Sequence, residues 1–153
     1  MEDERMKWLR ESKPVHVIES LRTCDCVRIM VDARWKAKEN AGIRWVAFSA
    51  VGDMFFETSK AIKAESAMQA EALGIREVLF WALDQGLWHL EVSSGCLPII
   101  AFIAGIRQTH HLTKEILDDI LSLSSYFHCL SFSYIPRLFN DIAHGLACKA
   151  MIS

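Results

Sequence analysis

The sequence predicts a single α/β domain, built on a mixed five-stranded sheet with helices flanking it. Three observations support this prediction: segments in which apolar and polar residues alternate, one long segment of helical spacing, and a length of 153 residues that suits one domain. The expected order of elements is β-β-β-α-β-α-α-β-α. No Walker loop or Gly-x-Gly-x-x-Gly motif follows a predicted strand, so the pattern is not that of a doubly wound nucleotide-binding domain.

The first three strands are predicted to form an antiparallel meander. After Cys26 the apolar and polar residues alternate with the period of two that is typical of a strand, and we expect this strand to end at Asp32. A polar loop over residues 36–40 leads to a second strand over 43–50, and a tight turn connects that strand to a third over 54–59.

The rest of the chain is predicted to alternate helices with strands. Apolar residues recur every three or four positions between Ser66 and Gln85, and Gly86 is a stop signal, which together predict the longest helix. The other expected elements are a strand over 87–92, a turn over 93–95, a helix opened by Pro98, a helix over 113–124 capped by Thr113, a strand over 129–135 and a last helix over 140–151.

Composition limits the classes of function. The formal net charge is -2 with a pI near 6.3, so any contact with nucleic acid must come from a local group of basic residues. The longest apolar run, residues 97–106, is too short to cross a bilayer, and the acidic start does not resemble a secretory signal. We therefore expect an intracellular protein, in the nucleus or cytoplasm. The five cysteines include no Cys-x-x-Cys pair, which favours reduced thiols over a zinc site.

The chain divides into two parts by composition. Residues 1–23 are rich in charges of both signs and are expected to form an N-terminal arm, which could contact a protein partner through Trp8. Residues 24–153 carry the patterns described above and form the expected domain.

Several segments carry a resemblance to a known family. Residues 31–35 read Val-Asp-Ala-Arg-Trp, residues 41–46 read Ala-Gly-Ile-Arg-Trp-Val, and residues 70–73 read Ala-Glu-Ala-Leu within the longest predicted helix. Residues 131–137 read Ser-Phe-Ser-Tyr-Ile-Pro-Arg, and residues 140–147 read Asn-Asp-Ile-Ala-His-Gly-Leu-Ala. In this order and spacing the segments resemble the ribonuclease H-like domain of plants, which is related to the ribonuclease H portion of non-LTR reverse transcriptases.

The resemblance implies a ribonuclease H-like fold and a set of site residues. In the family, an Asp, a Glu, a second Asp and a final Asp or His hold two divalent metals against the phosphate that is cut. Asp32, Glu71 and His144 match the first, second and fourth of these positions, but Gly95 stands at the third. Mg²⁺ or Mn²⁺ would then be held weakly by Asp32 and Glu71, because Gly95 has no side chain to offer.

Two of these positions also have ordinary structural explanations. Glu71 lies on the helix face expected to meet the sheet, where a carboxylate is costly unless it binds a metal or pairs with an arginine or a backbone amide. His144 is equally well explained as a surface histidine that bonds to a neighbour. We favour the shared-site interpretation for Glu71 and leave both interpretations open for His144.

The sequence therefore predicts a nucleic-acid-binding domain with a degenerate two-metal site. Arg34, Lys36 and Lys38 follow Asp32 and could contact phosphates, although Lys36 and Lys38 could equally belong to a solvated loop. The alternatives are an active metal-dependent RNA/DNA hybrid ribonuclease and a protein-interaction module that kept the fold.

Overall fold

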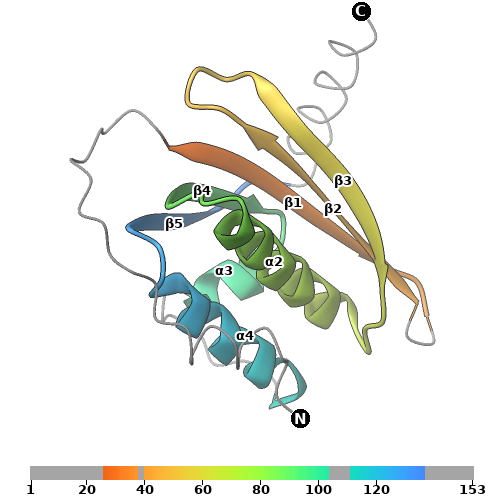
Figure 1. Ribbon diagram of the computed structural model, residues 1–153. Coiled ribbons are helices and arrows are strands. Elements are labelled where there is room, and N and C mark those ends of the chain that lie inside the picture. The colour runs from red at the N-terminus through yellow and green to blue at the C-terminus, as the bar shows by residue number, and fades with distance from the viewer. Residues whose placement is uncertain (1–25, 38–39, 104–110, 137–153) are drawn as a thin grey trace, which may run out of the picture.

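The computed structural model describes residues 26–37, 40–103 and 111–136 of the chain. Its centre is one five-stranded sheet with the strand order β3-β2-β1-β4-β5 (Figure 1). The strands are β1 (Val27–Trp35), β2 (Ala41–Phe48), β3 (Met54–Ile62), β4 (His89–Ser94) and β5 (Cys129–Tyr134). The first three form an antiparallel meander, and β4 and β5 are added in parallel beside β1. The predicted mixed sheet of five strands is thus confirmed.

Three described helices connect the strands: α2 (Ala67–Asp84), α3 (Leu97–Ile103) and α4 (His111–Ser124). α2 packs against β1 and β2 and lies beside α4 (Figure 1). The observed order is the predicted one through β5. The last predicted helix, over 140–151, and the N-terminal arm over 1–23 lie outside the described residues. Within the described parts, no helix is long and apolar enough to cross a membrane.

Helix α2 begins and ends where its sequence signals place it. Ser66 is the N-cap residue, and its side chain accepts a hydrogen bond from the backbone N–H of Gln69 over 3.0 Å. Gly86 has a φ of 70°, a left-handed conformation that glycine adopts without the strain a β-carbon would add. The Ser66 to Gly86 boundaries of the longest helix are therefore confirmed.

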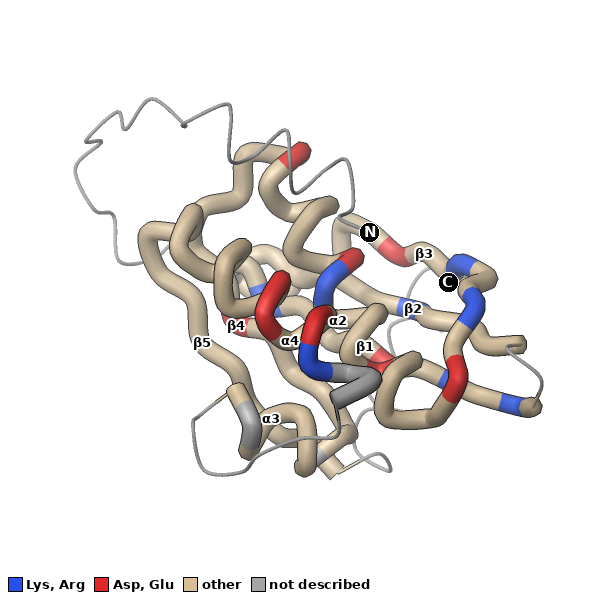
Figure 2. Tube along the Cα trace, turned by 90° about the horizontal axis from the view of Figure 1, so that it is seen from below, with Lys and Arg blue, Asp and Glu red and all other residues tan. Residues whose placement is uncertain are grey.

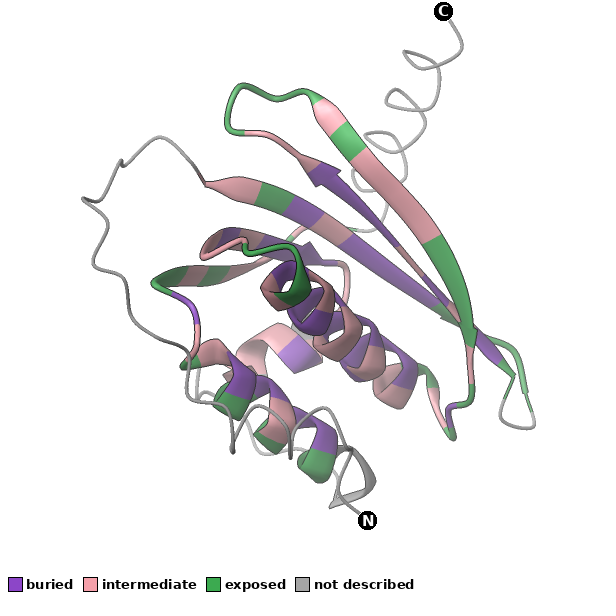
Figure 3. Cartoon of the chain, viewed as in Figure 1, coloured by how far each residue is buried: buried purple, intermediate pink, exposed green. Residues whose placement is uncertain are grey.

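The core lies between the sheet and α2 and continues to α4. Buried residues form stripes along β1, β2 and the inner face of α2 (Figure 3). At the closest approach, a β-carbon on Gly74 would stand 3.2 Å from a methyl of Val31 and 3.3 Å from one of Ile43. Gly74 therefore lets α2 sit directly on β1 and β2, which fixes the position of the helix over the sheet.

The predicted end of the first strand is wrong by three residues. β1 continues past Asp32 to Trp35 because β2 remains paired with it as far as Trp35 opposite Ala41. On its other side, the parallel pairing with β4 ends at Val31 opposite Ser94. Asp32 is therefore the residue at which β1 loses one of its two neighbours, although it is not the end of the strand.

Three smaller predictions also need correction. Arg34 lies within β1 and not in the following loop, because the meander extends the strand. Ser93 and Ser94 are the last residues of β4 and not part of a turn, since both pair with β5. Thr113 lies inside α4, which begins at His111, so it is not the cap residue of that helix.

Candidate nucleic-acid site

Asp32 projects from the face of the sheet that does not carry α2. Its neighbours in β1, Val31 and Ala33, are buried on the α2 side, and successive side chains of a strand point to opposite faces. The Asp32 side chain is only 9% exposed. A buried carboxylate requires positive charge or hydrogen-bond donors close by, so the groups around it determine what it can do.

Two arginines approach the same oxygen of Asp32. Arg44 stands opposite Asp32 in the β1–β2 register, and its Nη2 lies 3.9 Å from Oδ2 of the carboxylate. Arg34, two residues along β1, places its Nε 4.0 Å from that same Oδ2. Both arginines keep contact with solvent, since their side chains are 35% and 72% exposed. Asp32 is thus a buried acid flanked by two accessible guanidinium groups.

Glu71 lies on α2 near the level of Asp32. It is 3% exposed, the most deeply buried charged residue described. Trp35 at the end of β1 donates a hydrogen bond from Nε1 to the Ala64 carbonyl over 2.9 Å, so α2 starts where β1 finishes. Gly74 is the residue of α2 that packs on Val31 of β1. Glu71 precedes Gly74 by three residues, which is a rise of about 4.5 Å along the helix. One residue of strand rises about 3.3 Å, which brings Asp32 to a similar height along β1.

Gly95 directly follows the last residue of β4, whose pairing with β1 ends one residue before Asp32. Because Val31 pairs with Ser94, one further step along both strands brings Asp32 and Gly95 to the same level. The end of β4 is held by two hydrogen bonds: the Ser94 carbonyl accepts from the N–H of Ile135 over 3.0 Å, and the Ser94 hydroxyl accepts from the N–H of Cys96 over 3.1 Å. The position beside Asp32 therefore carries no side chain that could bind a cation.

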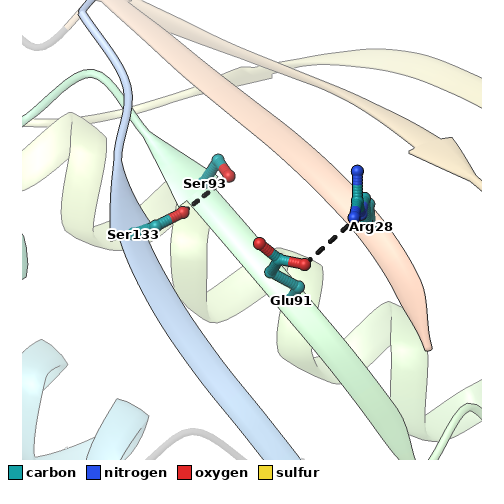
Figure 4. Close-up of polar contacts among 4 residues, drawn as sticks. All are labelled: Arg28, Glu91, Ser93 and Ser133. Atoms are coloured by element: carbon teal, nitrogen blue, oxygen red, sulfur yellow. Dashed lines mark hydrogen bonds and ion pairs between the residues drawn. The ribbon is translucent and has the colours of Figure 1, made fainter.

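The same face carries two polar pairs at lower levels of the sheet (Figure 4). The Ser93 and Ser133 hydroxyls lie 2.9 Å apart and join β4 to β5. Arg28 Nε lies 3.3 Å from a carboxylate oxygen of Glu91, its partner in the β1–β4 register. Arg28 is four residues from Asp32, about 13 Å at the rise of a strand, so Glu91 is engaged elsewhere and cannot replace the missing acid.

Of the expected metal ligands, Asp32 and Glu71 lie among the described residues. Within residues 26–37, 40–103 and 111–136, no three His, Cys, Asp or Glu side chains come together closely enough to hold a metal ion. Asp32 and Glu71 offer two carboxylates, but two cationic side chains already approach Asp32. His144 and Lys38 lie outside the described residues.

The positive charge beside Asp32 is local. Lysines and arginines on β1, β2 and β3 are interspersed with acidic residues (Figure 2). Lys36, which follows β1, is exposed. Arg44 also lines a shallow groove of about 550 Å³ along the edge strand β3, where Glu57 and Ser59 are among its neighbours.

Comparison with known families agrees with this architecture. The family model described as "Reverse transcriptase-like" matches residues 30–150. The chain belongs to the reverse transcriptase-like family. Its match runs from within β1 to beyond β5 and includes Asp32, Glu71 and Gly95. A search among curated proteins gives no match.

Solved structures similar to this reverse transcriptase-like chain are ribonucleases H. RNase H1 from Halobacterium salinarum NRC-1 is 23% identical, with a TM-score of 0.72 over 82% of this chain and 97% of that one. The N-terminal RNase H domain of rv2228c from Mycobacterium tuberculosis is 23% identical, with a TM-score of 0.69 over 83% and 94%. LC11-RNase H1, solved in complex with an RNA/DNA hybrid, is 22% identical, with a TM-score of 0.68 over 83% and 99%. These likenesses confirm the predicted ribonuclease H-like fold.

One feature of the site was not found from the sequence. The position of Arg44 opposite Asp32 was not predicted, because it depends on the register of β1 with β2. A signal did exist, since Arg44 is a cation at an alternate position of a strand in which Ile43, Trp45 and Ala47 are buried. Such a residue must face the side of the sheet away from the helix.

Proposed function

We propose that this chain binds nucleic acid, an RNA/DNA hybrid or a related duplex, and that its two-metal site is too degenerate to cut it at an ordinary rate. The observation that carries the proposal is that the β1–β4 pairing ends at Val31 and Ser94, the residues that directly precede Asp32 and Gly95. The residue best placed to complete a carboxylate cluster with Asp32 therefore has no carboxylate.

Binding is supported by the relatives and by local charge. LC11-RNase H1 and a foamy viral protease-reverse transcriptase were both solved in complex with an RNA/DNA hybrid. In this chain Arg34 is exposed beside Asp32, Lys36 is exposed just after β1, and Lys38 follows them in the sequence. Contacts to phosphates supply most of the affinity for nucleic acid and make it sensitive to salt, so a few such residues can give a measurable, salt-dependent interaction.

Impaired hydrolysis follows from the ligands that remain. Asp32, Glu71 and, as a proposed fourth ligand, His144 would have to bind Mg²⁺ or Mn²⁺ without a second aspartate, and imidazole is a poor ligand for Mg²⁺. When bound, such a metal would activate water and stabilise the leaving oxygen. Loss of a group that stabilises charge at a catalytic site commonly costs about a thousandfold in rate.

The decisive experiment compares wild type with Gly95→Asp and Asp32→Asn on a labelled RNA/DNA hybrid in Mg²⁺ or Mn²⁺. We expect binding without cleavage by wild type and recovered cleavage by Gly95→Asp. Cleavage by wild type that is lost in Asp32→Asn would show that another group supplies the missing ligand, and would make the chain an active hybrid ribonuclease.

A binding measurement separates this proposal from the remaining alternative. If wild type has no affinity for hybrid, duplex or single strands even at low salt, the nucleic-acid proposal fails. The fold would then serve as a protein-interaction module, and deletion of residues 1–23 would test whether the expected N-terminal arm recruits a partner.

A further inference from the structure

We propose that Arg44 and Arg34 make the Asp32 site a metal-independent phosphate-binding site. This inference rests on the proposed function and deepens it, because it names the side chains and the ligand chemistry of that site. It starts from the three charged groups that converge on one face of the sheet: Asp32 and Arg34 from β1, and Arg44 from β2.

The register of the meander creates this arrangement. Arg44 is the direct cross-strand partner of Asp32, and the partner of Arg34 is Gly42, which has no side chain. A β-carbon on Gly42 would find only the Lys60 carbonyl, 3.9 Å away, so the surface beside Arg34 is open. Gly95, on the other side of Asp32, leaves a second position without a side chain.

Distances and exposure indicate that the arginines can take a further anion. Both guanidinium groups lie 3.9 to 4.0 Å from Asp32 Oδ2, longer than the contacts of about 2.7 to 2.9 Å that a tight charge-assisted hydrogen bond makes. Each guanidinium carries five N–H donors, and the exposed fractions of 35% and 72% leave part of each group in solvent. A phosphate can therefore reach both arginines from the solvent side.

The balance of charge favours an anion over a divalent cation at this point. At Oδ2 itself, Asp32 contributes one negative charge and the two arginines that approach this oxygen contribute two positive charges, whereas Glu71 belongs to α2 on the other face of the sheet. A metal bound to Asp32 Oδ2 would stand within a few ångströms of both guanidinium groups and would be repelled by them. Planar guanidinium groups also match the geometry of phosphate oxygens, which is why arginine is frequent at phosphate sites.

Two further acidic groups on this face of the sheet limit how the ligand can lie. Glu57 shares the groove along β3 with Arg44, and Glu91 is paired with Arg28 further down the sheet. A phosphate placed over Gly42 stays near the two arginines and away from Glu57, which pairs with Val46, four residues along β2 from Gly42.

The test measures the affinity of the full chain for a labelled RNA/DNA hybrid by fluorescence anisotropy, in EDTA and in Mg²⁺. We expect the Kd to change less than about threefold on chelation. We expect Arg44→Gln to weaken binding about tenfold or more in both conditions, as loss of a good arginine contact does. Arg28→Gln is the matched control, since Arg28 is a paired arginine of the same strand and face, and it should leave the affinity within about twofold.

The Asp32→Asn variant distinguishes the two kinds of site by the sign of its effect. At an arginine site, loss of the competing negative charge should leave hybrid binding unchanged or make it tighter. At a metal site the same change should abolish Mg²⁺-dependent binding. Circular dichroism of each variant confirms that the domain is folded, and Arg44→Gln tests the same proposal without altering the buried acid.

The outcomes separate this inference from the proposed function. If the hybrid binds only in Mg²⁺ and Asp32→Asn abolishes that binding, the arginine site is wrong and the nucleic-acid function stands. If binding is independent of metal but insensitive to Arg44→Gln, the inference is likewise overturned. If no nucleic acid binds under any condition, both fail.

Discussion

Arg76 on α2 and Asp119 on α4 form an ion pair of 2.8 Å that joins the two helices behind the sheet. Their side chains are 16% and 28% exposed, so the pair is largely shielded from solvent. The contact spans 43 residues of sequence. It therefore helps to set how α4 packs on α2, and through α2 the position of Glu71 over β1.

Removal of one partner should destabilise the fold. Pairs at the surface contribute about 0 to 1 kcal/mol, whereas breaking a fully buried pair costs about 3 to 5 kcal/mol. For Asp119→Asn we expect the free energy of unfolding to fall by about 1 to 3 kcal/mol in urea melts, between these limits. The matched control is Glu77→Gln, which breaks the more exposed 3.1 Å pair with Lys60 and should cost less. Equal losses from the two variants would contradict the argument.

The N-cap of α2 provides a second test. Ser66→Ala removes the hydroxyl that accepts from the N–H of Gln69, and loss of such a cap costs about 0.5 to 2 kcal/mol. Ser66→Asp retains an acceptor and should keep most of the stability. Thermal unfolding followed by circular dichroism checks both. If alanine and aspartate behave alike, the cap hydrogen bond contributes nothing to stability.

The C-terminal end of α2 gives a third prediction. Gly86→Ala places a β-carbon at a φ of 70°, and the left-handed conformation costs a residue with a β-carbon about 1 to 2 kcal/mol. A β-carbon there would meet nothing within 4 Å, so the loss reflects backbone strain and not a clash. Gly42→Ala is the control, because its β-carbon would make only an ordinary contact in a strand. A loss at Gly42 that matches the loss at Gly86 would refute the strain argument.

The fold could be predicted from local patterns because each pattern depends on residues within one helix or strand. Alternation along β1, the spacing of apolar residues on α2, and the signals at Ser66 and Gly86 each report on a single element. Strand ends were less accurate, since the extension of β1 to Trp35 depends on its pairing with β2 and not on its own residues.

The candidate site could be predicted only in part, for the same reason. Asp32, Glu71 and Gly95 were found through resemblance to a family, and two of them are buried charged groups in the structure. Pairing of Arg44 with Asp32 could not be read from the sequence, because it depends on which residues of two strands stand opposite each other. A shift of one residue in that register would turn Arg44 away from the carboxylate.

Cysteine chemistry provides the last prediction. Cys26 precedes β1 and Cys129 begins β5, so β4 separates them by two strand spacings of about 4.8 Å, which is too far for a disulfide. Burial raises the pKa of the Cys26 thiol, and the nearby charges of Glu91 and Cys129 raise it further. Only the thiolate reacts with iodoacetamide, so the alkylation rate of Cys26 should reach its midpoint at a higher pH in the folded chain than in urea. Mass spectrometry of the Cys26 peptide measures this rate separately from the other cysteines.

Glu91→Gln removes one of the charges and should move the midpoint part of the way back without changing exposure. An unchanged midpoint in that variant would show that Glu91 does not contribute, whereas a midpoint equal in folded and unfolded chains would contradict the prediction. The raised pKa also makes stability depend on pH. Because the thiol loses its proton at a lower pH in the unfolded chain than in the folded chain, the contribution of Cys26 to stability is complete below the unfolded pKa. This contribution declines as the pH rises above the unfolded pKa.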